Sequence, residues 1–218
     1  MSEQPVRAVW TDFGGVVTPA MSHTWGAFCA QLGVNPDILL DTVIRVSAGY
    51  GTKDFMEPLD TPMVSEREWL AQIGTILEAE HGYSVHLESL GPIWFNERET
   101  NQGWVDRLLA AKRDDVFVGM LSNMVPAWDP YWRKLVPVRE MFDDLVLSFE
   151  VGCRKPEAAI FELAAGRAGV EPAECVLIDD LAVNCAGAIA AGWQAIHFTD
   201  TDKAIAELDA MLGVAVAL

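Results

Sequence analysis

Short β-prone segments alternate with helical segments over the second half of this sequence, and one more β-prone segment lies near its start. The β-prone segments are residues 6–11, 116–121, 145–149, 175–178 and 194–198. Residues 181–191, residues 201–212 and a segment opened by Pro156 show the apolar spacing of helices. Strands that alternate with helices pair in parallel, with helices on both faces of their sheet. The pattern therefore predicts an α/β fold with a doubly wound parallel sheet.

Residues 20–99 interrupt this alternation with a purely helical pattern. Asn35 and Pro36 suit the cap and first turn of one helix, and Ser65-Glu66-Arg67-Glu68 fits the capping box of another. We therefore expect an α/β catalytic core from residues 1–19 plus 100–218, and an inserted all-helical cap domain from residues 20–99. An insertion after the first strand is expected over the carboxyl ends of the strands, where such sheets bind ligands.

Composition narrows the classes of partner. The 218 residues are 51% hydrophobic and carry 32 Asp plus Glu against 15 Lys plus Arg, a formal net charge of -17. Such a surface argues against binding to nucleic acid or to an anionic membrane. The first residues lack the basic and apolar stretches of a signal peptide, and no apolar run approaches the roughly 20 residues of a spanning helix. We expect a soluble cytoplasmic protein. The apolar ending, residues 214–218, could form a strand, a packed tail or a contact surface, and the oligomeric state stays open.

A polar cluster follows each of the first four predicted strands. The clusters are Asp12 with Gly14 and Gly15, Ser122 with Asn123, Lys155, and Asp179 with Asp180. Because the carboxyl ends of parallel strands meet at one edge of a sheet, we expect these side chains to converge on a single pocket. Any one cluster alone is weak evidence for a functional site, since glycines favour turns, Ser and Asn favour loops, and a lysine is usually exposed.

Together the four clusters resemble the four motifs of the haloacid dehalogenase superfamily. The motifs read VWTDFGGVVT around Asp12, GMLSN ending at Asn123, RKPE around Lys155, and VLIDDLAVN from Val176 to Asn184. Their order and spacing match over essentially the whole chain, and the helical insertion looks like the smaller cap type of that family. The resemblance implies a Rossmann-like core and a hydrolase, which we expect to be a phosphoric monoester hydrolase acting on a small phosphorylated metabolite.

The residue chemistry agrees with this interpretation. Asp12 at a strand end can attack phosphorus and form an aspartyl-phosphate. Ser122 and Lys155 complete the predicted catalytic set, with Lys155 supplying positive charge to the transferring group. The predicted phosphate-binding residues are Phe13, Gly14, Gly15, Ser122, Asn123 and Lys155. The phosphate contacts of the glycines are expected from their main-chain N–H groups.

Two adjacent carboxylates at a strand end repel one another, so that one of them must hold a proton unless a divalent cation compensates their charge. Mg²⁺ fits best, since it prefers oxygen ligands and keeps several waters. The predicted metal ligands are Asp12, the main-chain oxygen of Gly14, and one or both of Asp179 and Asp180. Asn184, one helical turn beyond Asp180, is a possible further member of the site, although a surface asparagine is nearly as common.

One position departs from the family pattern. Most phosphatases of this family carry a second Asp two residues after the nucleophile, which acts as general acid for the leaving group, and this chain has Gly14 there. His23, at the start of the cap, is a possible substitute acid, and a substrate with a good leaving group needs none. The alternatives are a metal-independent dehalogenase, whose relatives also lack that Asp, and a ligand-binding pseudo-enzyme on the same scaffold.

Overall fold

The computed structural model describes residues 5–85 and 88–214, and their contacts divide the chain into two compact units. The α/β unit comprises Met1–Ala20, Glu99–Asn123 and Leu135–Leu218, and the helical unit comprises Met21–Arg98 and Met124–Lys134. The segment Met124–Lys134 lies in the predicted core by sequence but belongs to the helical unit. Its Trp128 ring stacks on Trp94 at 6.1 Å, which explains why it groups there.

A five-stranded parallel sheet forms the centre of the α/β unit and confirms the predicted fold class. Its strands are β1 (Ala8–Thr11), β2 (Phe117–Ser122), β3 (Asp144–Leu147), β4 (Cys175–Asp179) and β5 (Gln194–His197). They lie in the order β3-β2-β1-β4-β5, and every neighbouring pair is parallel. The chain moves outward from β1 in one direction and then in the other, so the switch point lies at the ends of β1 and its neighbours.

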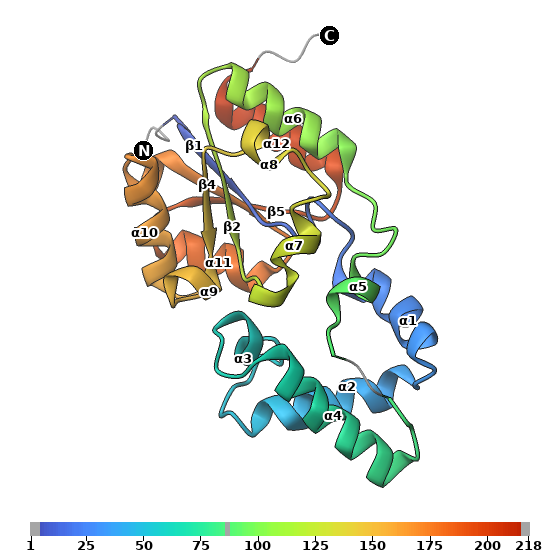
Figure 1. Ribbon diagram of the computed structural model, residues 1–218. Coiled ribbons are helices and arrows are strands. Elements are labelled where there is room, and N and C mark those ends of the chain that lie inside the picture. Colours follow the sequence, from blue (N-terminus) through green and yellow to red (C-terminus); the bar gives the residue numbers. More distant parts are fainter. Residues whose placement is uncertain (1–4, 86–87, 215–218) are drawn as a thin grey trace. The chain divides into compact units, whose positions relative to one another are not determined.

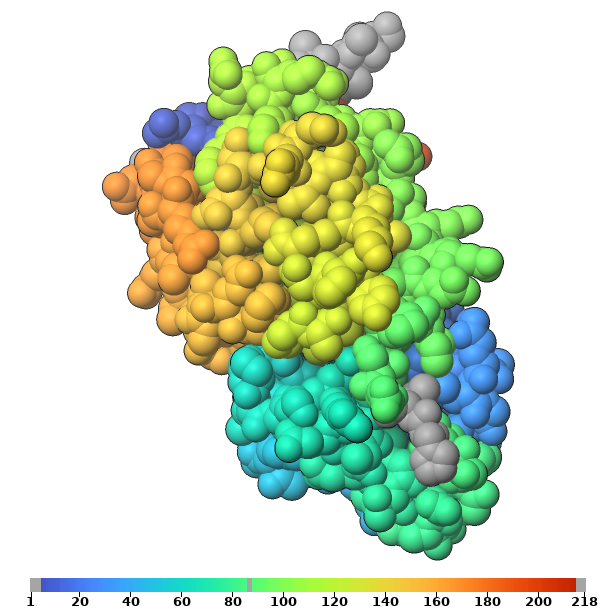
Figure 2. Space-filling view, in the orientation of Figure 1, coloured from blue at the N-terminus to red at the C-terminus, as the bar shows by residue number. Residues whose placement is uncertain are grey.

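Helices cover both faces of this sheet, as a doubly wound fold requires (Figure 1). On one face α6 (Gln102–Arg113) contacts α12 (Thr201–Leu212), and on the other α10 (Ala158–Ala168) contacts α11 (Ala182–Ala190). Short helices α8 (Val138–Met141), α9 (Ser148–Val151) and η2 (Pro172–Glu174) complete the connections. On the face shown in Figure 2 the surface of this unit is formed by α6 in green, the segment with α8 in yellow and α10 in orange.

Trp10 on β1 anchors the core between the sheet and helices α10 and α11. Its ring is fully buried and lies 6.4 Å from the ring of Trp193, which in turn meets Phe161 edge-on at 5.4 Å. Gly119 on the adjacent strand makes room for it, because a Cβ there would lie 2.3 Å from Cζ3 of Trp10. Burying a ring of this size contributes roughly 1.5–3 kcal/mol to the free energy of unfolding.

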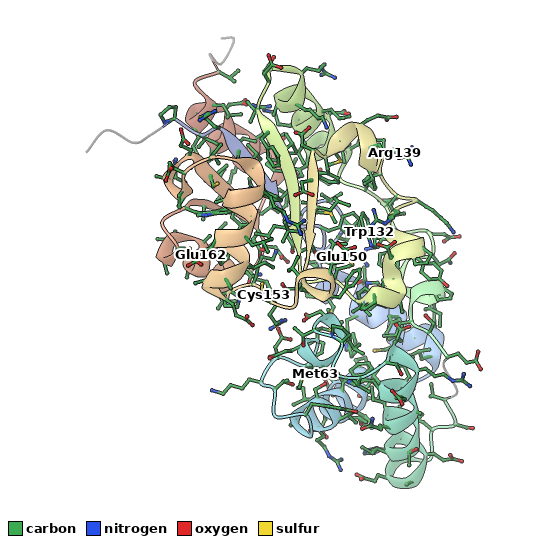
Figure 3. All side chains as sticks on the ribbon, turned by 60° about the vertical axis from the view of Figure 1, so that its left-hand side comes forward. Met63, Trp132, Arg139, Glu150, Cys153 and Glu162 are labelled. Atoms are coloured by element: carbon green, nitrogen blue, oxygen red, sulfur yellow. The ribbon has the colours of Figure 1, made fainter. Side chains whose placement is uncertain are left out.

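All elements of the helical unit within its described residues are helices. They are α1 (Met21–Leu32), α2 (Pro36–Ala48), α3 (Glu57–Asp60), α4 (Glu66–His81), α5 (Gly91–Trp94), η1 (Pro126–Trp128) and α7 (Asp129–Trp132). The two predicted helix starts are confirmed. Asn35 caps α2 with Pro36 in its first turn, and Ser65 and Glu68 form a capping box at α4. Trp132, labelled in Figure 3, is the last residue of α7, and the guanidinium carbon of Arg133 lies 4.5 Å from the centroid of its ring.

Two local predictions differ from the structure. Pro156 does not open a helix: its peptide bond with Lys155 is cis, Glu157 is extended, and α10 begins only at Ala158. The third strand ends at Leu147, because the chain turns at once into α9. The predictions about the first four residues and most of the apolar C-terminal ending lie outside the described residues. Among the described helices, none combines the length and the apolarity needed to cross a membrane.

Candidate functional site

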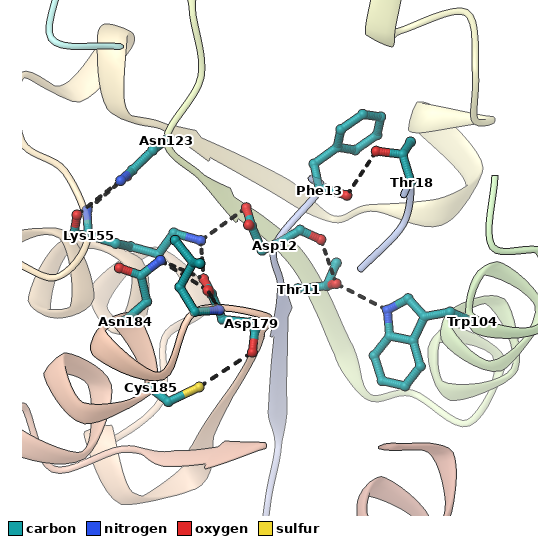
Figure 4. Close-up of polar contacts among 11 residues, drawn as sticks. Thr11, Asp12, Phe13, Thr18, Trp104, Asn123, Lys155, Asp179, Asn184 and Cys185 are labelled. Atoms are coloured by element: carbon teal, nitrogen blue, oxygen red, sulfur yellow. Dashed lines mark hydrogen bonds and ion pairs between the residues drawn. The ribbon is translucent and has the colours of Figure 1, made fainter. Parts of the chain in front are cut away.

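Asp12 lies directly after β1, at the carboxyl edge of the sheet. Its main-chain N–H donates to the carbonyl of Ile178 at 2.8 Å, so the parallel register places Asp12 beside Asp179 at the end of β4. The preceding residue, Thr11, is buried and links this edge to α6. Its hydroxyl donates to the carbonyl of Asp12 at 2.8 Å and accepts from Trp104 Nε1 at 3.1 Å (Figure 4).

Lys155 joins two of the carboxylates. Its Nζ lies 3.0 Å from Asp12 Oδ1 and donates to Asp179 Oδ2 at 2.5 Å, and the side chain is completely buried. Asn123, just after β2, holds the Lys155 main chain from both sides (Figure 4). Asn123 Nδ2 donates to the Lys155 carbonyl, and the Lys155 N–H donates to Asn123 Oδ1, each at 2.9 Å. The lysine is therefore a fixed charge inside the unit.

Asp179 is held by a set of hydrogen-bond donors. Asn184 on α11 donates its Nδ2 to both carboxylate oxygens, at 3.0 and 3.1 Å, and the N–H of Leu181 donates to Oδ1 at 2.9 Å. With Lys155 this makes Asp179 the centre of the buried polar network. Asn184 is thus a buried partner of Asp179 and does not lie on the helix surface.

Asp180 depends on the glycine at position 15. A Cβ on Gly15 would lie 2.0 Å from Asp180 Oδ2, and Gly15 has a φ of +86°, a conformation that side chains disfavour. The Gly15 N–H donates to the carbonyl of Thr18 at 2.8 Å. This N–H, which we expected near the phosphate, closes the tight turn after β1. Gly14 next to it is exposed, and a Cβ there would meet no atom within 4 Å.

The electrostatics reflect the crowding of these charges. Burial raises the pKa of Asp12, although Lys155 and a hydrogen bond with Ser122 oppose the rise. Burial would lower the pKa of Lys155, but Asp12 and Asp179 outweigh it and the pKa is raised. Burial, together with the charges of Asp12 and Asp179, raises the pKa of Asp180 to about 7. One lysine therefore does not balance the three carboxylates.

The donor set suits a hard divalent cation. One ligand oxygen from each of Asp12, Asp179 and Asp180 lies within 4.8 Å of the others. All three are carboxylate oxygens, the ligand type that Mg²⁺ prefers. The absence of a Cβ at Gly15 leaves the Asp180 carboxylate room at the same edge. The residues present thus fit the predicted ion.

The structure brings together Asp12, Ser122, Lys155, Asp179, Asp180 and Asn184, with Asn123 behind the lysine. His23 lies exposed on α1 of the helical unit. Sequence reasoning missed the supporting residues. His197 at the end of β5 has its Nε2 3.0 Å from the carbonyl of Asp180, and the Thr11–Trp104 pair holds Asp12. Thr11 and His197 could have been noticed from their positions at strand ends, whereas Trp104 on α6 carries no such signal.

Polar side chains that converge at the carboxyl ends of a doubly wound parallel sheet define a class of α/β proteins in which ligands bind at the switch point. Comparison with known proteins identifies the family within that class. The family model for haloacid dehalogenase-like hydrolases matches residues 6–192. This chain belongs to the haloacid dehalogenase-like hydrolases.

Two curated relatives differ in how much of their length the chain covers. Acyl-CoA dehydrogenase family member 10 of Mus musculus is 35% identical over 210 residues, which are 95% of this chain but 19% of the mouse protein. The chain thus spans about a fifth of that relative. D-ribitol-5-phosphate phosphatase of Bacteroides thetaiotaomicron is 26% identical over 184 residues, covering 80% of this chain and 83% of that enzyme.

Solved structures show the same fold. An enzyme of this family from Bacteroides thetaiotaomicron aligns with a TM-score of 0.69 at 19% identity and covers 90% of this chain and 95% of its own. A complex of that enzyme with magnesium and inorganic phosphate aligns with a TM-score of 0.62 at 20% identity, covering 89% and 94%. L-2-haloacid dehalogenase of Xanthobacter autotrophicus aligns at 0.58 and 16% identity, covering 87% and 76%.

Proposed function

We propose that this protein is a Mg²⁺-dependent phosphatase that hydrolyses a small phosphorylated metabolite through an aspartyl-phosphate on Asp12. The observation that carries the proposal is the cluster of Asp12, Asp179 and Asp180, with Lys155 Nζ 3.0 Å from Asp12 Oδ1. A relative that aligns with 80% of this chain is named D-ribitol-5-phosphate phosphatase. A structural neighbour was solved in complex with magnesium and inorganic phosphate. Both facts support the same reaction class.

The reaction has two steps. In the first, an oxygen of Asp12 forms a bond to phosphorus while the bond between phosphorus and the leaving oxygen breaks. In the second, water attacks the phosphorus of the aspartyl-phosphate, which releases inorganic phosphate and restores Asp12. Lys155 places its charge beside the attacking carboxylate, and the Ser122 hydroxyl and the N–H groups after Asp12 orient the phosphoryl oxygens.

Asp12, Asp180, the main-chain oxygen of Gly14 and one oxygen of Asp179 would hold the ion. When bound, Mg²⁺ polarises the phosphoryl oxygens and offsets the clustered carboxylates. Asp179 has a second task, because its hydrogen bonds fix Lys155 and Asn184. We assign Asn123 the positioning of Lys155, since its amide is bonded to the lysine main chain on both sides.

Gly14 favours one competing function. The position lacks the usual general acid, as it does in the family's dehalogenases, and an L-2-haloacid dehalogenase shares the fold. That chemistry attacks carbon and needs no metal. The three clustered carboxylates argue against it, because at neutral pH they leave excess negative charge that a divalent cation offsets better than a proton shared among them. A pseudo-enzyme that binds phosphate without turnover is the remaining alternative, and an assay of phosphate release distinguishes it from a phosphatase.

The test is a panel of phosphorylated small molecules assayed for phosphate release with Mg²⁺, with excess EDTA, and with Mg²⁺ restored. We expect release that EDTA stops and Mg²⁺ recovers. Asp12→Asn should abolish it, and Asp202→Asn, an exposed carboxylate on α12, should leave it unchanged. Halide release from 2-haloacids that persists in EDTA would establish the dehalogenase instead, and phosphate binding without turnover would establish the pseudo-enzyme.

A further inference from the structure

The helical unit encloses an apolar cavity of its own, apart from the carboxylate cluster. It has a volume of about 40 Å³, and every residue that lines it belongs to the helical unit. Helices α1, α2 and α4 supply most of the lining residues, and Trp94 and Trp128 also line it. The space is several times the roughly 10–15 Å³ that one water molecule needs.

Polar atoms of the wall are turned away from this space into hydrogen bonds. Trp69 Nε1 donates to Ser47 Oγ at 3.1 Å, and the Ser47 hydroxyl donates to the carbonyl of Phe55 at 2.7 Å. Trp25 Nε1 donates to the carbonyl of Pro36 at 3.4 Å. Trp25 and Trp69 line the cavity, and their indole N–H groups are used in these bonds. A water inside would find few partners, and apolar cavities of this kind stay dry or take apolar ligands.

A buried carboxylate fixes one wall. Glu66, at the start of α4, is buried and accepts from Trp128 Nε1 at 2.7 Å, from Ser89 Oγ at 2.7 Å and from the Leu90 N–H at 3.2 Å. Burying a carboxylate is unfavourable unless such donors surround it. The three bonds bring Trp128 and Leu90, from segments far apart in sequence, to the same cavity. The wall is thus specifically built, and differs from a loose gap between helices.

Aromatic faces make up much of this wall. Trp94 stacks on Trp128 at 6.1 Å and meets Phe28 edge-on at 5.3 Å, so flat apolar surfaces border the space. Some lining residues, among them Met21 and Trp25, are half-buried, which gives a route from the surface. We propose that the helical unit binds a small uncharged apolar molecule, aromatic or branched aliphatic, in this cavity. The site does not depend on the reaction proposed at Asp12.

Benzene is a suitable probe, with phenol as its polar counterpart, because the hydroxyl of phenol would exchange its hydrogen bonds to water for an almost wholly apolar wall. Both are titrated into the whole protein while the methyl groups of lining residues are followed by NMR. We expect benzene to give saturable shifts at the methyls of Leu39, Val43 and Ile73, and phenol to bind at least ten-fold more weakly. Shifts that do not saturate, that centre on the α/β unit, or that are equal for phenol would overturn the proposal.

Two adjacent leucines on α2 give a matched pair of variants. Leu39 lines the cavity and is 5% exposed, whereas Leu40 is 36% exposed and does not line it. Leu39→Phe fills the space and should weaken benzene binding at least ten-fold, while Leu40→Phe should change it less than two-fold. Val43→Leu, with the exposed Ile44→Leu as its control, serves if Leu39→Phe does not fold by circular dichroism. A folded filling variant that binds benzene like wild type, or an equal loss in the exposed control, contradicts the proposal.

Discussion

Asn123 and Lys155 exchange two hydrogen bonds of 2.9 Å between the side-chain amide of one and the main chain of the other. The bonds join the end of β2 to the loop before α10 and fix where the lysine side chain begins. From there Nζ reaches Asp12 and Asp179. The position of the Lys155 charge beside Asp12, the proposed nucleophile, therefore depends on Asn123.

Removing that amide tests its positioning role. Asn123→Ala leaves the N–H and carbonyl of Lys155 without these partners, and misplacement of a catalytic group by about 1 Å can lower a rate roughly 10²-fold. We expect kcat to fall about 10- to 100-fold, with a small change in KM and a folded protein by circular dichroism. Steady-state kinetics on the best substrate measure this. A folded variant with kcat within two-fold of wild type would show that Lys155 needs no such support.

The two glycines after Asp12 should respond differently to the same substitution. Gly15→Ala places a Cβ 2.0 Å from Asp180 Oδ2 and adds strain at a φ of +86°, worth about 1–2 kcal/mol for the conformation alone. We expect it to lower Tm and to weaken the response to Mg²⁺. Gly14→Ala is the matched control, since its Cβ meets no atom within 4 Å and should leave Tm nearly unchanged. Equal melting curves for the two variants would contradict the arrangement of this turn.

Magnesium should stabilise the protein in a pH-dependent way. In the metal-free protein, burial and the charges of Asp12 and Asp179 raise the pKa of Asp180 from 3.8 to about 7. The folded state then binds a proton that the unfolded chain releases, so stability from this group falls as pH rises from about 4 through 7. Mg²⁺ replaces that proton. We expect the gain in Tm on adding Mg²⁺ to be larger at pH 8 than at pH 6, and to be reduced in Asp180→Asn.

Differential scanning fluorimetry at both pH values measures that gain, with Ca²⁺-free buffers and an EDTA reference. Asp202→Asn, on the exposed side of α12, is the control for the loss of a carboxylate. A gain that is equal at the two pH values, or larger at pH 6, would mean that Asp180 does not exchange a proton for the ion.

The absence of an acidic side chain at Gly14 predicts a preference among substrates. Without a general acid there, a leaving group must depart with little help from a proton, and such catalysis is typically worth about 10²–10⁴ in rate. Acyl and aryl phosphates should therefore be hydrolysed faster than alkyl phosphates of similar size. Gly14→Asp should narrow the difference, because a Cβ at this position has room. Initial rates across a matched panel give the result.

The alternative is that His23 supplies the proton. His23→Ala should then slow alkyl phosphates far more than aryl phosphates, since only the former need an acid. If wild type shows no dependence on the leaving group and His23→Ala has no effect, both versions fail.

The strand ends were predictable because the polar residues there interrupt apolar segments. Asp12, Asp179 and Asp180 each follow a run of buried residues, and parallel pairing alone brings such ends to one edge. Helix caps were predictable for a similar reason: Asn35 and Ser65 act on N–H groups two or three residues away. Local chemistry of this kind is visible in sequence.

Long-range contacts were not predictable in the same way. Nothing in the sequence near Trp104 indicates that its indole N–H reaches Thr11, and the role of Glu66 requires knowing that Trp128 groups with the helical unit. The helix start at Pro156 was predicted wrongly, because a proline fits an extended segment before a helix as well as it fits the first helical turn. These features depend on how distant segments pack, which pattern and propensity do not encode.

The most direct measurement of the central claim is the transfer of labelled phosphate to the protein. Wild type and Asp12→Asn are mixed with [³²P]acetyl phosphate, with Mg²⁺ or with EDTA, quenched in acid within milliseconds and digested for mass spectrometry. The account predicts a label that is stable in acid, released by hydroxylamine, located on Asp12 and formed only with Mg²⁺. Phosphate release at an undiminished rate in Asp12→Asn, or a label on another residue, would contradict it.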